Sequence, residues 1–110
     1  MGAHRELHTA LLDLEATLKA ADLWRMPTPE AAAFSSQQPF CVDTMSLLQW
    51  LRFVFIARLE SLAEAGGPMP AKCEVAPAVA AYLQQEQTPA HHQLLVVRAV
   101  ERVDKVVTEN

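Results

Sequence analysis

The chain has 110 residues, of which 51% are apolar and 20% are charged, and its formal net charge at pH 7 is −4. This length and balance suit one domain, residues 1–110, that can bury a core without disulfides or metal ions. Because phosphate binding needs clustered Lys and Arg, the nine scattered basic residues of this acidic chain argue against direct DNA binding.

The first predicted helix runs from about His4 to Leu23, where apolar residues recur at spacings of three and four. Glu15 and Lys19 are four residues apart, a favourable spacing for an ion pair on one helix face. The apolar stripe consists of Leu7, Leu11, Leu14, Leu18 and Ala21.

A long connection follows, because three prolines between Trp24 and Phe40 exclude a continuous helix. Thr28 before Pro29 is a typical helix start, which predicts a short helical turn from Pro29 to Phe34. A connection of this length needs side chains that hold it to the core, and we expect Trp24, Phe34 and Phe40 to do so.

The second helix is predicted to begin at Asp43 or Thr44, which serve as its cap, and to end near Ala65, before a Gly-Gly-Pro stop. It contains the most apolar run of the chain. The longest uninterrupted stretch of that run, 53–57, is far shorter than the roughly 20 residues of a membrane span. The segment therefore predicts a core helix.

Two further helices are predicted after a proline-bounded loop, each with a proline near its start. The third covers 77–87, and the fourth runs from Pro89 to about Val107. The valine-rich part of the fourth segment alone would also fit a strand, but its helical spacing and the Glu101–Lys105 pair favour a helix. The four segments predict an all-α fold, a four-helix bundle with a long first connection.

Arg58 falls in the middle of the apolar face when the second helix is placed on a wheel at about 100° per residue. A buried guanidinium keeps its charge and needs a partner, so we expect a structural ion pair with Glu15 or Asp104 on another helix. Asp43 is excluded because the intervening helix would place it about 22 Å away. The alternative interpretation is a site for an anion, or a catalytic site, built around Arg58.

Aromatic residues and this arginine form the candidate surface for a partner or ligand, which consists of Trp24, Phe40, Trp50, Phe53 and Arg58. Trp50 and Phe53 fall on the otherwise polar side of the second helix. The aromatic residues either anchor the long connection or form an exposed binding patch.

The other chemistry-bearing residues show no catalytic or metal-binding pattern. His4 and His8 are four residues apart but lack the Glu and the further ligand of a zincin site. Cys41 and Cys73 are expected to be free thiols in a reducing cytoplasm, and no base is positioned beside Cys41. We expect no catalytic residue, no metal and no cofactor, so the sequence favours a protein without enzymatic activity.

Several short motifs and single residues resemble those of a known family. The motifs are LEATL around Glu15, QPF ending at Phe40, DTM at 43–45, WL starting at Trp50, PMP, and VAP at 75–77, and the single residues are Trp24, Arg58, Glu101 and Asp104. With these motifs the chain resembles the YqcC-like family of small bacterial proteins from about Leu14 onward. Two residues depart from the family pattern: Cys41 stands where an aromatic or bulky residue is common, and Ala57 where a proline can precede the arginine. The resemblance implies an all-helical bundle but no established activity.

Members of this family are often encoded beside a tRNA pseudouridine synthase, which supplies a candidate protein partner. The leading hypothesis is therefore a cytoplasmic, non-enzymatic interaction protein, an accessory to tRNA modification. The competing hypothesis is a binder of a small anionic ligand, or an enzyme, that uses Arg58. Direct RNA binding is a third hypothesis, and none of the three involves a membrane.

Overall fold

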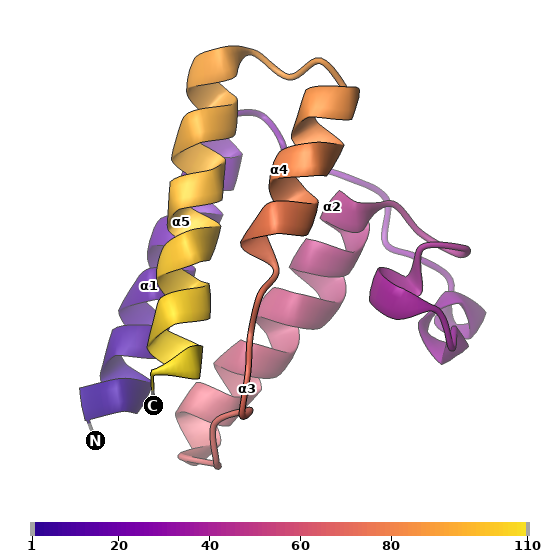
Figure 1. Cartoon of the computed structure of the whole chain (residues 1–110). Helices are drawn as coiled ribbons and strands as arrows, with labels where there is room; N and C mark the ends of the chain where they lie inside the picture. The colour runs from indigo at the N-terminus through magenta and orange to yellow at the C-terminus, as the bar shows by residue number, and fades with distance from the viewer. Residues whose placement is uncertain (1, 110) are drawn as a thin grey trace.

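The structure is a computed structural model and describes residues 2–109. Four helices and no strand are present among these residues, so the predicted all-α bundle is confirmed (Figure 1). The helices are α1 (Gly2–Ala20), a second helix made of α2 (Leu47–Trp50), the π-helical segment η3 (Leu51–Ile56) and α3 (Ala57–Ala65), then α4 (Ala76–Gln85) and α5 (Ala90–Thr108). The first connection contains two short 3₁₀ turns, η1 (Ala31–Ser35) and η2 (Pro39–Cys41).

The helices run alternately up and down, so that the two ends of the chain lie at the same end of the bundle (Figure 1). α1 packs against α5 and α3, while α4 packs against α5 and α2. The first connection leaves this arrangement and forms a separate lobe beside α2 (Figure 1). No helix between residues 2 and 109 is long and apolar enough to cross a membrane.

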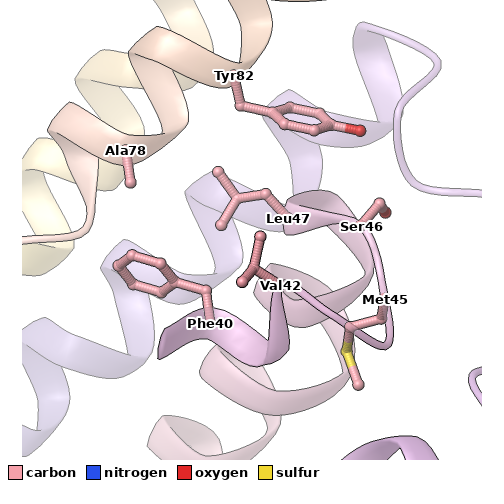
Figure 2. Close-up of a pocket in the computed structure, with 7 residues that line it drawn as sticks. All are labelled: Phe40, Val42, Met45, Ser46, Leu47, Ala78 and Tyr82. Carbon is pink, nitrogen blue, oxygen red and sulfur yellow. The ribbon is translucent and has the colours of Figure 1, made fainter. Parts of the chain in front are cut away.

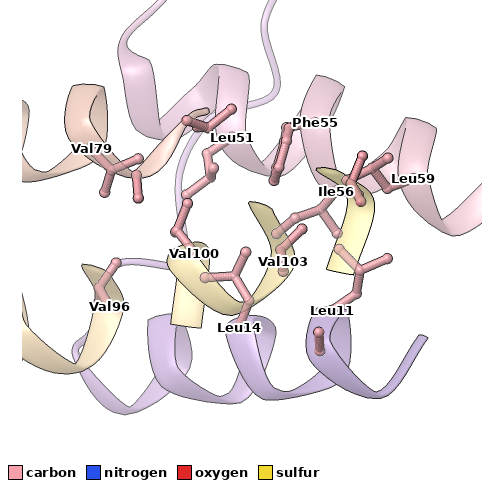
Figure 3. Packing of buried hydrophobic residues seen from close by; sticks show 14 of the residues in the cluster. Leu11, Leu14, Leu51, Phe55, Ile56, Leu59, Val79, Val96, Val100 and Val103 are labelled. Atoms are coloured by element: carbon pink, nitrogen blue, oxygen red, sulfur yellow. The ribbon is translucent and has the colours of Figure 1, made fainter. Parts of the chain in front are cut away.

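The core between the helices combines leucines from α1 with valines from α5 (Figure 3). Its most deeply buried side chains are Leu7, Leu11, Leu14, Leu18, Leu51, Val79, Leu83, Val96, Val100, Val103 and Val107. Each contributes roughly 1.5–3 kcal/mol relative to an exposed side chain. The helical spacing of the leucines in α1 and of the valines in α5 thus identifies the buried faces of these two helices.

The π-helical segment η3 changes which residues of the second helix face the core. A π turn takes up about one extra residue, so the residues after it are rotated by about 100° relative to a continuous α-helix. Leu59 is 6% exposed and faces the core, whereas Arg58 is exposed to solvent. The predicted burial of Arg58 is therefore wrong, because the wheel assumed uninterrupted α-helical periodicity.

The second helix begins later than predicted, with Ser46 as its N-cap. The Ser46 hydroxyl accepts a hydrogen bond from the Gln49 N–H, and the Gln49 side chain accepts one from the Ser46 N–H. The predicted capping role of Asp43 and Thr44 is wrong. Asp43 instead accepts a hydrogen bond from Ser36, and Thr44 donates one to a backbone carbonyl of η1 (2.8 Å), so both hold the first connection together.

The N-terminus of α4 is capped by a side chain of α5. One carboxylate oxygen of Asp104 accepts hydrogen bonds from the N–H groups of Val75 (2.9 Å) and Ala76 (2.8 Å). The Thr108 hydroxyl accepts from the Cys73 N–H (2.9 Å) and donates to the Cys73 carbonyl (3.1 Å). These bonds fix the start of α4, and the loop before it, against α5.

Replacing Asp104 tests this cap. Asp104→Ala leaves two backbone N–H groups without their acceptor, and we expect the free energy of unfolding to fall by about 1–3 kcal/mol. The control is Glu101→Ala, an exposed position on the same helix, which should change it by less than about 0.5 kcal/mol. Urea denaturation followed by circular dichroism measures both, and equal stability of the two variants would contradict the capping role.

Candidate functional site

An apolar pocket of about 250 Å³ lies where η2 and the start of α2 face α4 (Figure 2). It is lined by Phe40, Val42, Met45, Ser46, Leu47, Ala78 and Tyr82. Tyr82 and Ala78 project from α4, and Phe40 and Leu47 approach from the opposite side (Figure 2). Two segments that are far apart in the sequence therefore create one concave apolar surface.

Phe40 is held in the wall of the pocket by a row of aromatic rings. Its backbone has a φ of 57°, a left-handed conformation that turns the chain sharply within η2. The Phe40 and Trp50 rings meet edge to face with centroids 4.8 Å apart, and Trp50 stacks on Phe55 at 5.4 Å. Phe40 and Trp50 thus anchor the first connection to the second helix, as the anchoring interpretation of these residues expects.

The open side of the pocket exposes a large apolar side chain. Val42 is 69% exposed, while Met45 is only 7% exposed and packs with Cys41 and Val54 beneath the connection. The pocket is also smaller than the roughly 300–1,000 Å³ of sites that enclose drug-sized ligands. Its size and its apolar lining suit one hydrophobic side chain of a partner better than a cofactor.

Trp24 and Phe53 belong to a second cluster, arranged around Arg52. The Arg52 guanidinium carbon lies 4.3 Å from the centre of the Trp24 ring and 4.8 Å from the centre of the Phe53 ring. The same guanidinium donates a hydrogen bond to the Trp24 carbonyl. This cluster ties the beginning of the first connection to the second helix, so Trp24 also acts as an anchor.

Arg58 belongs to neither cluster, and the predicted ion pair is wrong. Arg58 is exposed, whereas Glu15 forms an ion pair with Lys19 at 2.8 Å on α1. The Asp104 carboxylate accepts hydrogen bonds from the N-terminus of α4 and from the thiol of Cys73. The structure therefore brings together Phe40 with Trp50, and Trp24 with Phe53, but not these aromatic residues with Arg58.

Cys73 is half-buried beside α5, and its thiol donates a hydrogen bond to a carboxylate oxygen of Asp104 (3.1 Å). Burial, together with this hydrogen bond and the negative charge of Asp104, raises the pKa of Cys73 from 9.0 to about 12. Because the thiolate is the reactive form, Cys73 is a poor nucleophile at neutral pH. Asp104 and Cys73 therefore have a structural role at the start of α4.

Of the residues that line the pocket, Phe40 is the one predicted as a site residue from the sequence. Val42, Leu47 and Tyr82 lie on segments whose proximity depends on how α4 packs against α2, and no spacing in the sequence predicts that contact. Arg52 is not predicted as a contact residue, although a cation next to Phe53 in a chain with few aromatic residues is a usable signal for a stacking contact.

Comparison with known proteins identifies relatives along nearly the whole chain. The family model described as "DUF446: tRNA pseudouridine synthase C" matches residues 6–106. The uncharacterized protein YqcC of Escherichia coli is 32% identical over 111 residues, covering 100% of this chain and 98% of that protein. The solution NMR structure of E. coli YqcC superposes with a TM-score of 0.83 at 31% identity, covering 99% of this chain and 91% of that one.

Two further relatives match over part of their length. An uncharacterized protein of Haemophilus influenzae is 42% identical over 67 residues, which is 61% of this chain and 63% of that protein. A protein of Pectobacterium carotovorum named tRNA pseudouridine synthase C is 33% identical over 70 residues, which is 64% of this chain but only 19% of that protein. About four fifths of the Pectobacterium protein thus lies outside the match.

The two arginines of the second helix provide a matched pair of variants. Arg52→Ala removes the contacts with two aromatic rings and a backbone carbonyl, and we expect it to lower the free energy of unfolding by about 1–2 kcal/mol. Arg58→Ala should change it by less than about 0.5 kcal/mol, because this side chain is exposed. Thermal melts measure both, and a larger loss for Arg58→Ala would show that Arg58 has a buried partner.

Alkylation kinetics test the raised pKa of Cys73. In a Cys41→Ser background, we expect the reaction of the folded protein with iodoacetamide to stay slow at pH 9, where the same chain in urea reacts readily. Asp104→Asn should accelerate alkylation, and an unchanged rate would contradict the role of the carboxylate.

The raised pKa of Cys73 also affects stability. The protonated thiol contributes fully to the free energy of unfolding below pH 9.0, and this contribution is lost as the pH rises toward about 12.

Proposed function

Because the chain belongs to the DUF446 family, whose model is described as tRNA pseudouridine synthase C, we propose that it is a non-enzymatic accessory protein that binds a tRNA pseudouridine synthase. The pocket formed by Phe40, Val42, Leu47 and Tyr82 is the proposed contact surface. The proposal concerns a protein–protein contact and assigns no catalytic step to this chain.

The observation that carries the proposal is the partial match to the Pectobacterium protein. A segment similar to most of this chain is part of a much longer protein that is named a tRNA pseudouridine synthase. A covalent link keeps two units together at high effective concentration. A unit without that link can stay with its partner by binding to it, and this is the role that we assign to this chain.

The chemistry of the described side chains supports an accessory role. The pocket is lined by apolar groups and two hydroxyls, those of Ser46 and Tyr82, and no carboxylate, amine, guanidinium, thiol or imidazole lines it. The Ser46 hydroxyl already accepts a hydrogen bond within the capping box. The Cys73 thiol stays protonated at neutral pH because its pKa is raised to about 12. Neither group is set up as a nucleophile or as a general base.

Binding to the synthase is the direct test. The purified chain and the tRNA pseudouridine synthase C of the same organism are mixed at about 10 μM, where a complex of micromolar affinity is well populated. We expect co-elution in size-exclusion chromatography and a saturable signal in isothermal titration calorimetry. The chain alone should not retard tRNA in a native gel.

The native gel with tRNA distinguishes this proposal from direct RNA binding. A synthase that elutes without the chain would contradict the accessory role. A chain that retards tRNA alone, with an affinity that falls steeply as salt is added, would favour direct RNA binding instead.

A further inference from the structure

The pocket lies in a part of the chain that carries only negative formal charge. The two segments that supply its lining, residues 26–51 and 73–97, contain four carboxylates and no Lys or Arg. The carboxylates belong to Glu30, Asp43, Glu74 and Glu86, and all four side chains are exposed. Glu74 forms an ion pair with Lys72 at 3.4 Å, so within residues 2–109 Glu30, Asp43 and Glu86 supply the unpaired negative charge of these segments. All nine Lys and Arg residues of the chain lie outside these segments.

Two of these acids flank the pocket along the chain. Asp43 directly follows Val42, which lies at the open side of the pocket, and Glu86 lies one helical turn after Tyr82. The backbone N–H of Glu86 donates to the Tyr82 carbonyl at 3.0 Å, which fixes that spacing. Neither carboxylate lines the pocket itself, but an apolar depression whose lining residues are followed in the chain by exposed acids suits a partner that combines a hydrophobic side chain with neighbouring cations.

We propose that the pocket binds one apolar side chain of a protein partner and that Lys or Arg residues around that side chain face the acidic segments. This inference rests on the proposed function, because it specifies the surface through which the synthase is held. An enzyme that acts on tRNA needs basic surface to neutralise phosphates, so a basic partner surface follows from the partner's own chemistry.

The same charges disfavour two other occupants of the pocket. Phosphate groups of RNA would be repelled by the exposed carboxylates of both segments. A second copy of this chain would bring the same acidic segments against each other in a two-fold contact, which is unfavourable. A basic protein surface therefore matches the pocket better than RNA or a second copy.

The apolar part of the proposal is tested with one exposed residue and a matched control. Val42→Ser removes the apolar side chain at the open side of the pocket, and we expect the Kd for the synthase to rise about tenfold. The control is Leu94→Ser, which removes a 52% exposed leucine from α5, outside the pocket, and should change the Kd by less than about twofold. Thermal melts verify that both variants fold as the parent does.

The electrostatic part is tested with amides that keep the shape of each side chain. The double variant Asp43→Asn/Glu86→Gln should bind the synthase about five- to tenfold more weakly than the parent at about 0.05 M salt. The difference should disappear near 0.5 M salt, where the Debye length is about 4 Å. Glu6→Gln/Glu101→Gln removes the same charge from exposed positions on α1 and α5, and it should change the Kd by less than about twofold.

The outcomes separate the two proposals. If the parent chain binds no synthase, the accessory role and this inference both fail. If the parent binds but the Val42 and Asp43/Glu86 variants bind as well as their controls, the accessory role stands and the pocket is not the contact surface. If the Val42 variant weakens binding while the amide variant has no effect at low salt, the partner surface is apolar but not basic, and the charge part of the inference is wrong.

Discussion

The edge-to-face contact between Phe40 and Trp50 determines where the long first connection lies, and the pocket depends on it. Trp50 is itself stacked on Phe55 of the second helix, so the position of Phe40 is set by a rigid helix and not by the loop. The left-handed backbone of Phe40 makes the turn that brings Val42 to the open side of the pocket. Other contacts also hold the connection, among them Trp24 on Arg52 and Met45 on Val54, but the contact with Trp50 is the one that fixes the ring of Phe40 in the wall that faces α4.

The sequence is sufficient to predict the four helices because their signals are local. Leucines of α1 and valines of α5 repeat at helical spacing, and prolines and glycines mark the breaks between helices. The position of Arg58 could not be predicted in this way, since it depends on the π-helical segment that precedes it. A wheel with constant rotation per residue has no means of detecting one widened turn, so the residues after that turn are rotated from their predicted positions, by enough to bring Arg58 to the surface. The N-cap is predicted wrongly for a different reason. Asp43, Thr44 and Ser46 can all cap a helix, and only the tertiary contacts of Asp43 and Thr44 show that Ser46 is the cap.

The candidate site, too, could be predicted from the sequence only in part. Large rings in a proline-rich connection need a packing partner, and Trp24 and Phe40 each have one. The same expectation is wrong for Phe34, which is 39% exposed. The grouping of these aromatic residues could not be predicted, since Trp24 pairs with Arg52 on one part of the second helix and Phe40 pairs with Trp50 on another. The contribution of Tyr82 depends on the packing of α4, which no periodicity in the sequence encodes.

Both walls of the pocket are fixed before any partner binds. The α4 wall is held at its start by Asp104 of α5, through two backbone hydrogen bonds, and the opposite wall is held by Phe40 on Trp50. Such preorganisation lowers the entropy that binding has to offset, so a small contact surface can still give useful affinity. On our proposal that the pocket contacts a partner, the anchors beside Val42 keep this exposed apolar residue at the surface instead of letting it pack into the core. In the same proposal, the acidic residues of the segments that line the pocket would favour a basic protein over nucleic acid, so that the fold would supply the surface and the charge pattern the selectivity.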